Sequence, residues 1–143
     1  MASTFRSNLV KDGRRAGVGG GSQEVVVFAT YDVTAALVVN DVIEMVPVPA
    51  GAVITAVTLG ATDLDTGGSP AIVLDVGDGT TVDRLIAAAT VGQAGGSTST
   101  LPAGAFGYTY AAADTVDVKV KTAPATGATS GTISLRVAYV LDR

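Results

Sequence analysis

A strict alternation of apolar and polar residues toward the C-terminus constrains the fold of this chain more than any other feature. Every second residue from Val116 to Val120 is a valine, and the polar residues between and after them are Asp117, Lys119 and Lys121. A second run, from Thr132 to Tyr139, alternates in the same way. A period of two is that of an antiparallel strand with one buried face. We therefore predict two half-buried strands whose inward-facing side chains are Val116, Val118, Val120, Ile133, Leu135 and Val137.

Further apolar runs are separated by residues that favour turns, and we predict that each run forms a strand. The candidate strands are residues 24–31, 36–39 continuing toward 42–48, 52–59, 71–76, 84–88 and 107–111. Gly, Pro, Asn and Asp interrupt the chain between them, and the stretch from Gly92 to Pro102 is predicted to be a loop. The sequence contains no convincing amphipathic helix.

About eight short strands indicate an all-β fold, and we predict an antiparallel two-sheet sandwich of jelly-roll type. An immunoglobulin-type sandwich is the alternative, but the chain has no Cys pair and no Trp for such a core. At 143 residues the chain has the length of one domain. We expect an extended basic and Gly-rich N-terminal arm over residues 1–22 and the β-sandwich domain over residues 23–143.

The composition restricts both the core and the chemistry. Aromatic residues make up only 5% of the chain, so aliphatic side chains must fill most of the core. The few large side chains that we expect there are Phe28, Phe106, Tyr108 and Tyr139. The absence of Cys and His removes disulfides, thiol nucleophiles, the commonest general base and the commonest metal ligand. We therefore expect no catalytic residue, no cofactor and no bound metal, and we expect that the protein is not an enzyme.

The surface is poor in charge. Only 15% of the residues are charged, where roughly 25% is usual. A surface built largely from Ala, Thr, Gly, Ser and Val lacks the charge that keeps soluble monomers apart, and it suits burial against partners. We therefore expect a component of an assembly that forms a symmetric homo-oligomer.

The charges are divided unevenly between the arm and the rest of the chain. The arm has one acidic residue, and its basic residues are Arg6, Lys11, Arg14 and Arg15. Its net charge of +3 leaves −7 on the remaining residues, which together give the −4 of the chain. A solvated tail and a nucleic-acid contact are alternative roles for the arm. The acidic body and the presence of a single aromatic, Phe5, argue against direct binding of nucleic acid. We predict that the four basic residues bind acidic protein surface, and that residues 17–22 are a flexible linker.

Two further segments bear on localisation. The first residues contain no apolar segment typical of a signal peptide, so we expect synthesis in the cytoplasm. Residues 45–62 are uncharged over about the length of a membrane helix, but Pro47 and Pro49 would break a helix there. The β-branched residues that follow favour a strand, and we expect no contact with a membrane.

Several aspartates near the middle of the chain have functional and structural interpretations. Asp65-Thr66-Gly67 has the short signature of aspartic proteases, which need two such loops to share one proton, and this chain has one copy. Clustered carboxylates also suit calcium, although EF-hand spacing is absent; the residues concerned are Asp63, Asp65, Asp75, Asp78 and Asp83. Asp78-Gly79 between two candidate strands predicts a tight hairpin turn with positive φ. We predict that the aspartates serve turns, and a hydrolase based on carboxylates alone is the enzymatic alternative.

Three runs in the middle of the chain occur together, namely VPAGA at 48–52, DLDTGGSP at 63–70 and LDVGDG at 74–79. In these runs residues 48–96 resemble small structural proteins of tailed bacteriophages, and the resemblance resumes at 107–110 and 114–120. It implies a virion component, most like the capsid decoration or cement proteins with a jelly-roll body. Such proteins have no catalytic residues to carry over to this chain.

The resemblance and the composition together lead to one expected function. We expect a protein on the capsid exterior that binds the major capsid protein and reinforces the assembled shell. A head–tail connector or a tail structural protein is the alternative within the virion. A carbohydrate-binding or adhesin sandwich is a further alternative, but it would place several aromatics on a binding face, and this chain has four Tyr and no Trp.

Overall fold

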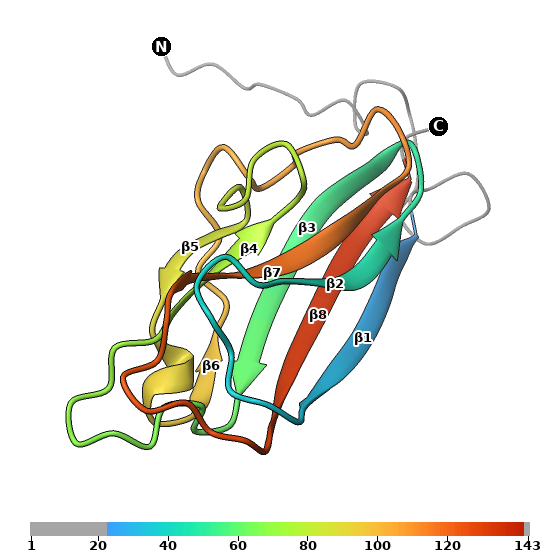
Figure 1. The fold of residues 1–143 in the computed structure, drawn as a ribbon. Coiled ribbons are helices and arrows are strands. Elements are labelled where there is room, and N and C mark those ends of the chain that lie inside the picture. The colour runs from blue at the N-terminus through green and yellow to red at the C-terminus, as the bar shows by residue number, and fades with distance from the viewer. Residues whose placement is uncertain (1–22, 142–143) are drawn as a thin grey trace, which may run out of the picture.

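The structure, a computed structural model, describes residues 23–141. These residues form two antiparallel four-stranded sheets that pack as a sandwich (Figure 1). The strands are β1 (Glu24–Val33), β2 (Val42–Val48), β3 (Ala52–Ala61), β4 (Val73–Gly77), β5 (Ile86–Ala89), β6 (Gly96–Thr98), β7 (Asp114–Thr122) and β8 (Gly131–Leu141). One sheet has the order β1-β8-β3-β6 and the other β2-β7-β4-β5. This is the strand order of a jelly roll, and it confirms the predicted fold class.

The two strands with the clearest alternation lie at interior positions of the sheets. β8 pairs with β1 on one side and β3 on the other, and β7 lies between β2 and β4. All six side chains predicted to face the core, three from each of these strands, are 0% exposed. The core between the sheets is aliphatic, as the composition predicts. Residues 45–62, whose uncharged length raised the question of a membrane helix, lie mainly in β2 and β3. Within residues 23–141, no helix has the length and apolar character needed to cross a membrane.

Some predicted strands are wrong or incomplete. Residues 36–39 are not a strand, because the chain reverses there through Asn40, which has a φ of 70°, and through a bond from the Val38 N–H to the Asp41 carboxylate at 2.8 Å. Residues 107–111 form only a bridge, in which Thr109 pairs with Val53. The predicted loop from 92 to 102 contains the short strand β6, which pairs with the end of β3 and follows a 3-10 turn at Val91–Gln93.

The expected positions of the aromatic residues are only partly correct. Tyr139 is buried and Tyr108 packs against the core, but Phe28 and Phe106 are 66% and 64% exposed. Phe28 lies on the outer face of β1 opposite Arg136, whereas the residues on either side of it point inward. Phe106 follows a turn closed by the Pro102 carbonyl oxygen, which leaves its ring outside. Tyr110, 3% exposed, is the buried aromatic that the sequence analysis did not include.

Candidate protein-interaction surface

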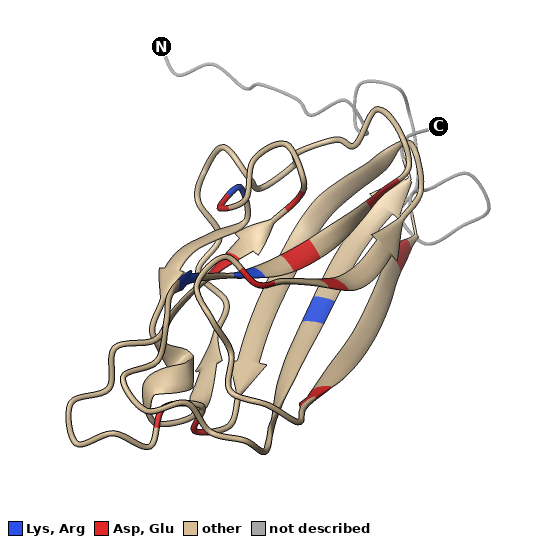
Figure 2. Ribbon diagram, in the orientation of Figure 1, with Lys and Arg blue, Asp and Glu red and all other residues tan. Residues whose placement is uncertain are grey.

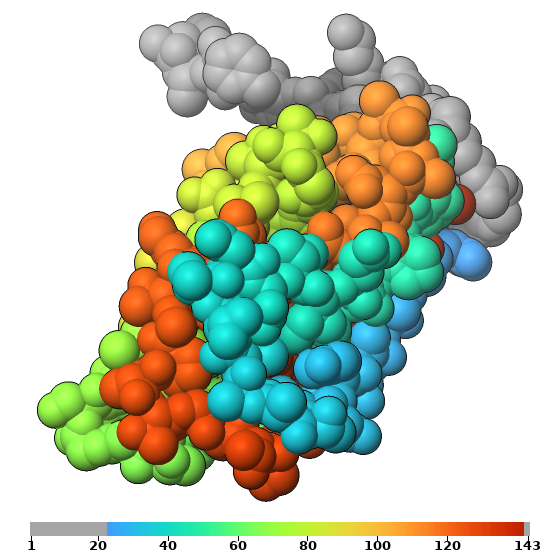
Figure 3. All heavy atoms as spheres, in the orientation of Figure 1, coloured from blue at the N-terminus to red at the C-terminus, as the bar shows by residue number. Residues whose placement is uncertain are grey.

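β1 is an edge strand with features that favour contact with another protein. Within the described residues it pairs with one strand, β8, through ten consecutive residues without a bulge. Between Glu24 and Asp32 it carries no charged residue and no proline. Natural edge strands are usually protected by charges, proline, bulges or covering loops, because an unprotected edge pairs readily with another chain. β1 forms the right-hand margin of the sandwich in Figure 1 and its blue atoms lie at the surface in Figure 3.

Four large apolar side chains of β1 are exposed, and we call them the β1 patch. They are Val25 at 37%, Val26 at 50%, Phe28 at 66% and Tyr31 at 39%. Exposed apolar residues that gather on one element indicate a protein-binding surface, whereas isolated ones are ordinary. The β1 patch is therefore the strongest candidate for a functional site in the described residues. The sequence contained a signal for it, because the run EVVVFATY has apolar residues at both phases of the strand.

The outer face of the sheet that contains β1 is nearly neutral, and Val26 and Phe28 are the members of the β1 patch that lie on it. Strand register places small or uncharged residues there, such as Ser134 of β8 and Thr58 and Gly60 of β3. Arg136 is the charged residue that these two strands contribute. In Figure 2 this appears as a single blue segment on β8. A weakly charged face of this kind extends the surface available to a partner.

The outer face of the other sheet is charged instead. Glu44 of β2 lies opposite Asp117 of β7, and Asp75 of β4 lies opposite Lys119. Asp117 was expected on the solvent side of a half-buried strand, yet it is only 8% exposed and accepts a bond from the Thr115 hydroxyl at 2.7 Å. Burial, together with the neighbouring carboxylates of Glu44, Asp114 and Asp78, raises the pKa of Asp117 despite that bond. The two faces of the sandwich therefore differ in the number of charges, because the second carries Lys119 and Lys121 as well as these carboxylates.

Asp65, in the protease-like triplet, has a structural role. It is 1% exposed, and its carboxylate accepts five backbone N–H bonds of 2.6 to 3.3 Å; the donors are Gly67, Ala71, Ile72, Ala125 and Thr126. Burial opposes the charge, but these donors hold the pKa of Asp65 well below its ordinary value. The carboxylate thus fixes the loop after β3 to the β7–β8 connection, as the turn interpretation predicts.

Asp78 does not form the tight hairpin turn that was predicted. Neither Asp78 nor Gly79 has a positive φ, and the connection from β4 to β5 runs over residues 78–85. Asp78 accepts bonds from the Thr80 and Thr81 N–H groups at 3.0 and 2.8 Å, which shapes a longer loop. A Cβ at Gly77 would overlap the Thr81 carbonyl oxygen, so this close approach requires glycine.

The same carboxylate connects that loop to the segment before β7. The Arg84 Nε donates to Asp78 at 2.6 Å, and the Tyr110 hydroxyl donates at 3.1 Å. The Arg84 guanidinium also lies 4.0 Å from the centre of the Tyr108 ring, which meets the Tyr110 ring edge-on at 5.0 Å. Burial opposes the ionised form, but Arg84, Thr81 and the other donors lower the pKa of Asp78. These contacts hold the β4–β5 loop against the segment that precedes β7.

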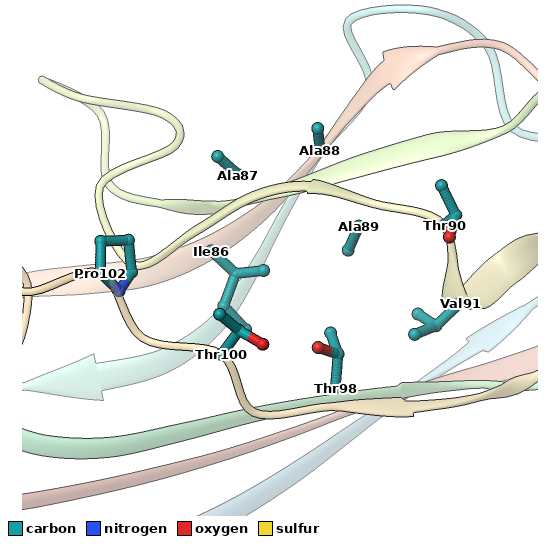
Figure 4. Close-up of a pocket in the computed structure, with 9 residues that line it drawn as sticks. All are labelled: Ile86, Ala87, Ala88, Ala89, Thr90, Val91, Thr98, Thr100 and Pro102. Carbon is teal, nitrogen blue, oxygen red and sulfur yellow. The ribbon is translucent and has the colours of Figure 1, made fainter.

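A cavity of about 340 Å³ lies between β5 and the segment from Thr98 to Pro102. Figure 4 shows Ile86 and Ala89 facing that segment, while Ala88 points away from it. Ala88 has a φ of 53° and donates its N–H to the Asp75 carboxylate at 2.8 Å, where β5 bulges against β4. The cavity lining contains threonine hydroxyls but no titratable side chain. It therefore has no groups suited to acid–base chemistry.

The remaining sequence-predicted site residues have the following positions. The arm residues Arg6, Lys11, Arg14 and Arg15 lie outside the described residues. Among residues 23–141, no three or more carboxylates are grouped so that they could hold a metal ion. The aspartates of the proposed calcium cluster are instead separate, since Asp65, Asp75 and Asp78 each bind different backbone groups.

The fold is a jelly-roll sandwich with an exposed apolar edge strand, and comparisons with solved structures find the same fold in phage capsids. One match is a chain in the capsid asymmetric unit of cyanophage Pam1, with 32% identity, a TM-score of 0.79, and coverage of 90% of this chain and 91% of that one. Another is a chain in the capsid of Ralstonia phage GP4, with 37% identity, a TM-score of 0.73 and coverage of 91% and 92%.

The protein therefore belongs to a family of structural proteins found in bacteriophage capsids, and it is a virion component. A chain in the acid-stable capsid of Helicobacter pylori bacteriophage KHP30 shares the fold, with 22% identity, a TM-score of 0.59 and coverage of 84% of this chain and 93% of that chain. No protein-family model matches the sequence, and no curated protein does.

Proposed function

We propose that this protein is a decoration protein that binds the outside of an assembled phage capsid and reinforces it. The observation that carries the proposal is its similarity, over nine tenths of the chain, to chains of the Pam1 and GP4 capsids. The apolar β1 patch and the neutral sheet face beside it support the proposal, because such surface is suited to a lattice of protein contacts.

The proposed role is structural and not enzymatic. The partner is the major capsid protein, and the copies associate as a symmetric homo-oligomer on the shell. In this proposal the arm residues Arg6, Lys11, Arg14 and Arg15 bind carboxylates on the capsid or on a sister subunit. The opposite signs of the arm, +3, and the remaining residues, −7, support contacts between copies.

The proposed reinforcement follows from thermodynamic linkage between binding of this protein and the stability of the shell. A protein that binds the assembled shell, and not the dissociated subunits, lowers the free energy of the shell and opposes its opening. Individual exposed ion pairs contribute only about 0–1 kcal/mol. Many copies on one shell, each with several contacts, provide the total effect.

The experiment adds purified full-length protein to shells that lack it. We expect co-sedimentation with the shells and a higher temperature of shell disruption by calorimetry. Gold-labelled antibody on intact virions should decorate the heads. Labelling of the neck or tail, or a protein that remains in the supernatant, would contradict the proposal and favour the connector or tail alternative.

A further inference from the structure

The edge of β1 that pairs with no other described strand carries a more specific inference. Alternate residues along the ten-residue strand direct backbone groups away from β8, and no other strand of residues 23–141 pairs with them; the strand has no lysine, proline or bulge to protect this edge. An extended segment can add to such an edge as a further strand, with backbone hydrogen bonds for affinity and side-chain contacts for specificity. The question is which segment is suited to it.

We propose that the edge of β1 binds the N-terminal arm of a second copy of this chain, as an added strand. The inference rests on the proposed role of the arm in joining subunits, and it identifies where the arm binds. Copies would then be linked through backbone pairing as well as through charge.

The length and position of the arm support this occupant. The sixteen residues before the Gly-rich linker can span about 50 Å, and a ten-residue strand such as β1 spans about 33 Å. Residues 3–10 of the arm contain no Gly or Pro and include Phe5, Leu9 and Val10, which suit an apolar edge.

Charge also favours the arm as the occupant. β1 carries a carboxylate near each end, at Glu24 and Asp32. The arm carries four basic residues, whose attraction to these carboxylates adds to the apolar contact. Direct pairing of two β1 strands about a two-fold axis through Phe28 would instead place Glu24 opposite Asp32, where like charges destabilise the pair.

Pairing of the arm with β1 of its own chain is less favourable. If residues 17–22 formed the reversal, Asp12 and Gly13 would lie opposite Val27 and Val26, in the middle of the patch. Asp and Gly are among the residues least suited to strands. The arm of another copy has no such constraint on register, and residues 3–10 are free to align with the patch.

The first test compares two exposed phenylalanines in the full-length chain, measured by light scattering during size-exclusion chromatography without capsid. Phe28→Lys places a cation on the proposed binding edge, and Phe106→Lys places it elsewhere at nearly equal exposure, 66% against 64%. We expect unsubstituted protein and Phe106→Lys to self-associate and Phe28→Lys to be monomeric. Circular dichroism checks that both variants remain folded. A monomer in all three cases, or equal association of both variants, overturns the inference.

The second test identifies the occupant by disulfide trapping, which is unambiguous because the chain has no native cysteine. One chain carries Ser7→Cys in the arm, and a second chain with a different tag carries Val26→Cys or Thr30→Cys, on either side of Phe28. Mixing the two chains and oxidising them should give a disulfide-linked dimer with one chain of each kind. A reducing agent should convert this dimer back to monomers. The control is Ser97→Cys on β6, an exposed serine at the opposite edge of the same sheet, which should give little cross-linked product.

The outcomes separate the inference from the proposed function. A single chain that carries both Ser7→Cys and Val26→Cys completes the set. If a disulfide forms only within that chain, and not between chains, the arm binds its own β1. If two Val26→Cys chains form a disulfide with each other, two β1 strands pair. Either result overturns the inference. Shell binding without association or trapping leaves the decoration role intact and rejects this mode. Trapping without shell binding rejects the decoration role alone.

Discussion

At Asp65 the backbone N–H groups of three separate segments converge on one carboxylate. The donors come from residue 67, from 71–72 and from 125–126, so the side chain replaces hydrogen bonds that these loops cannot make with one another. Since the lowered pKa of Asp65 belongs to the folded state, its ionised form stabilises the fold. That contribution is complete above the ordinary value of 3.8 and is lost as the pH falls below it toward the lowered pKa.

We therefore expect Asp65→Asn to lower the unfolding temperature at neutral pH, because its amide nitrogen cannot accept the bonds that a carboxylate oxygen accepts. The difference from the unsubstituted protein should shrink as the pH falls below 3.8. Thermal unfolding followed by circular dichroism across a pH series measures both effects. Asp83→Asn, at an exposed position, is the control. A difference that stays constant with pH would contradict the assignment.

Ala88 adopts a backbone conformation that is unfavourable for a residue with a Cβ atom. Its φ of 53° lies in the left-handed region, which costs a residue with a Cβ roughly 1–2 kcal/mol. Its side chain is exposed, so little packing would be lost on removing the Cβ. The bulge against β4 and the bond to Asp75 hold it there.

Ala88→Gly should raise the free energy of unfolding by roughly 0.5–1 kcal/mol, since relief of strain exceeds the backbone entropy that glycine adds to the unfolded chain. Ala87→Gly, at the exposed neighbour without positive φ, should lower it by about 0.5–1 kcal/mol. Urea denaturation of both variants gives the comparison. The same sign for both would show that strain at Ala88 is not significant.

Among the elements, the segment from Ala105 to Tyr110 depends on contacts that lie far away in the sequence. It runs along the start of β3, where the Ile54 N–H donates to the Tyr108 carbonyl oxygen and the Tyr110 N–H donates to the Ala52 carbonyl oxygen, both at 2.9 Å. A further attachment, through a side chain, is the bond from the Tyr110 hydroxyl to Asp78. Burial and the nearby Asp78 carboxylate raise the pKa of Tyr110, so the hydroxyl keeps its proton to donate.

Tyr110→Phe should lower the free energy of unfolding by roughly 1–2 kcal/mol, because it removes a buried bond to a charged group. Tyr31→Phe, on the β1 patch, should change it by only a few tenths. Chemical denaturation measures both variants. Equal losses would contradict a special role for the Asp78 contact in holding this segment.

The elements that sequence reasoning predicted well are those whose side chains alternate strictly. β7 and β8 were predictable because a central strand with one face on the core imposes that alternation. β6 was not, because three residues of Gly, Ser and Thr at an edge pack too little apolar surface to leave a pattern. The Asp78 loop was missed because the dipeptide suits a tight turn equally well, and its partners Arg84 and Tyr110 are brought to it by the fold.

The sequence predicted that the candidate site is a surface covered by partners, but it did not predict that β1 forms this surface. Low charge indicated a surface covered by partners, but Phe28 was expected in the core, since a phenylalanine between apolar neighbours is usually buried. Only the pairing of β1 with β8 shows which phase of the strand faces outward. The four basic arm residues lie outside the described residues, and their role stays a prediction.

For the whole molecule, we predict that folding and attachment to the shell depend on different parts of the chain. Within residues 23–141 the buried core runs from Val33 to Tyr139, and we predict that deleting residues 1–22 leaves the circular dichroism spectrum and unfolding temperature nearly unchanged. The deletion should weaken co-sedimentation with undecorated shells. Added salt should weaken the binding of intact protein more than that of the truncated form, because screening acts on exposed ion pairs more than on apolar contacts. Equal binding of both forms at every salt concentration would leave the arm without this function.

The position of β8 between β1 and β3 has a consequence for synthesis of the chain. β1 is made first, yet its partner is the last strand of the sandwich, and their pairing joins Glu24 to Val140. Until β8 has been synthesised, β1 and β3 lack the strand that lies between them. The sheet is completed only when β8 pairs with both. Closure of this sheet therefore depends on pairing between strands that lie far apart in the sequence, which slows folding. Until then β1 is unpaired along both edges, and its apolar side chains are exposed to mispairing with other chains.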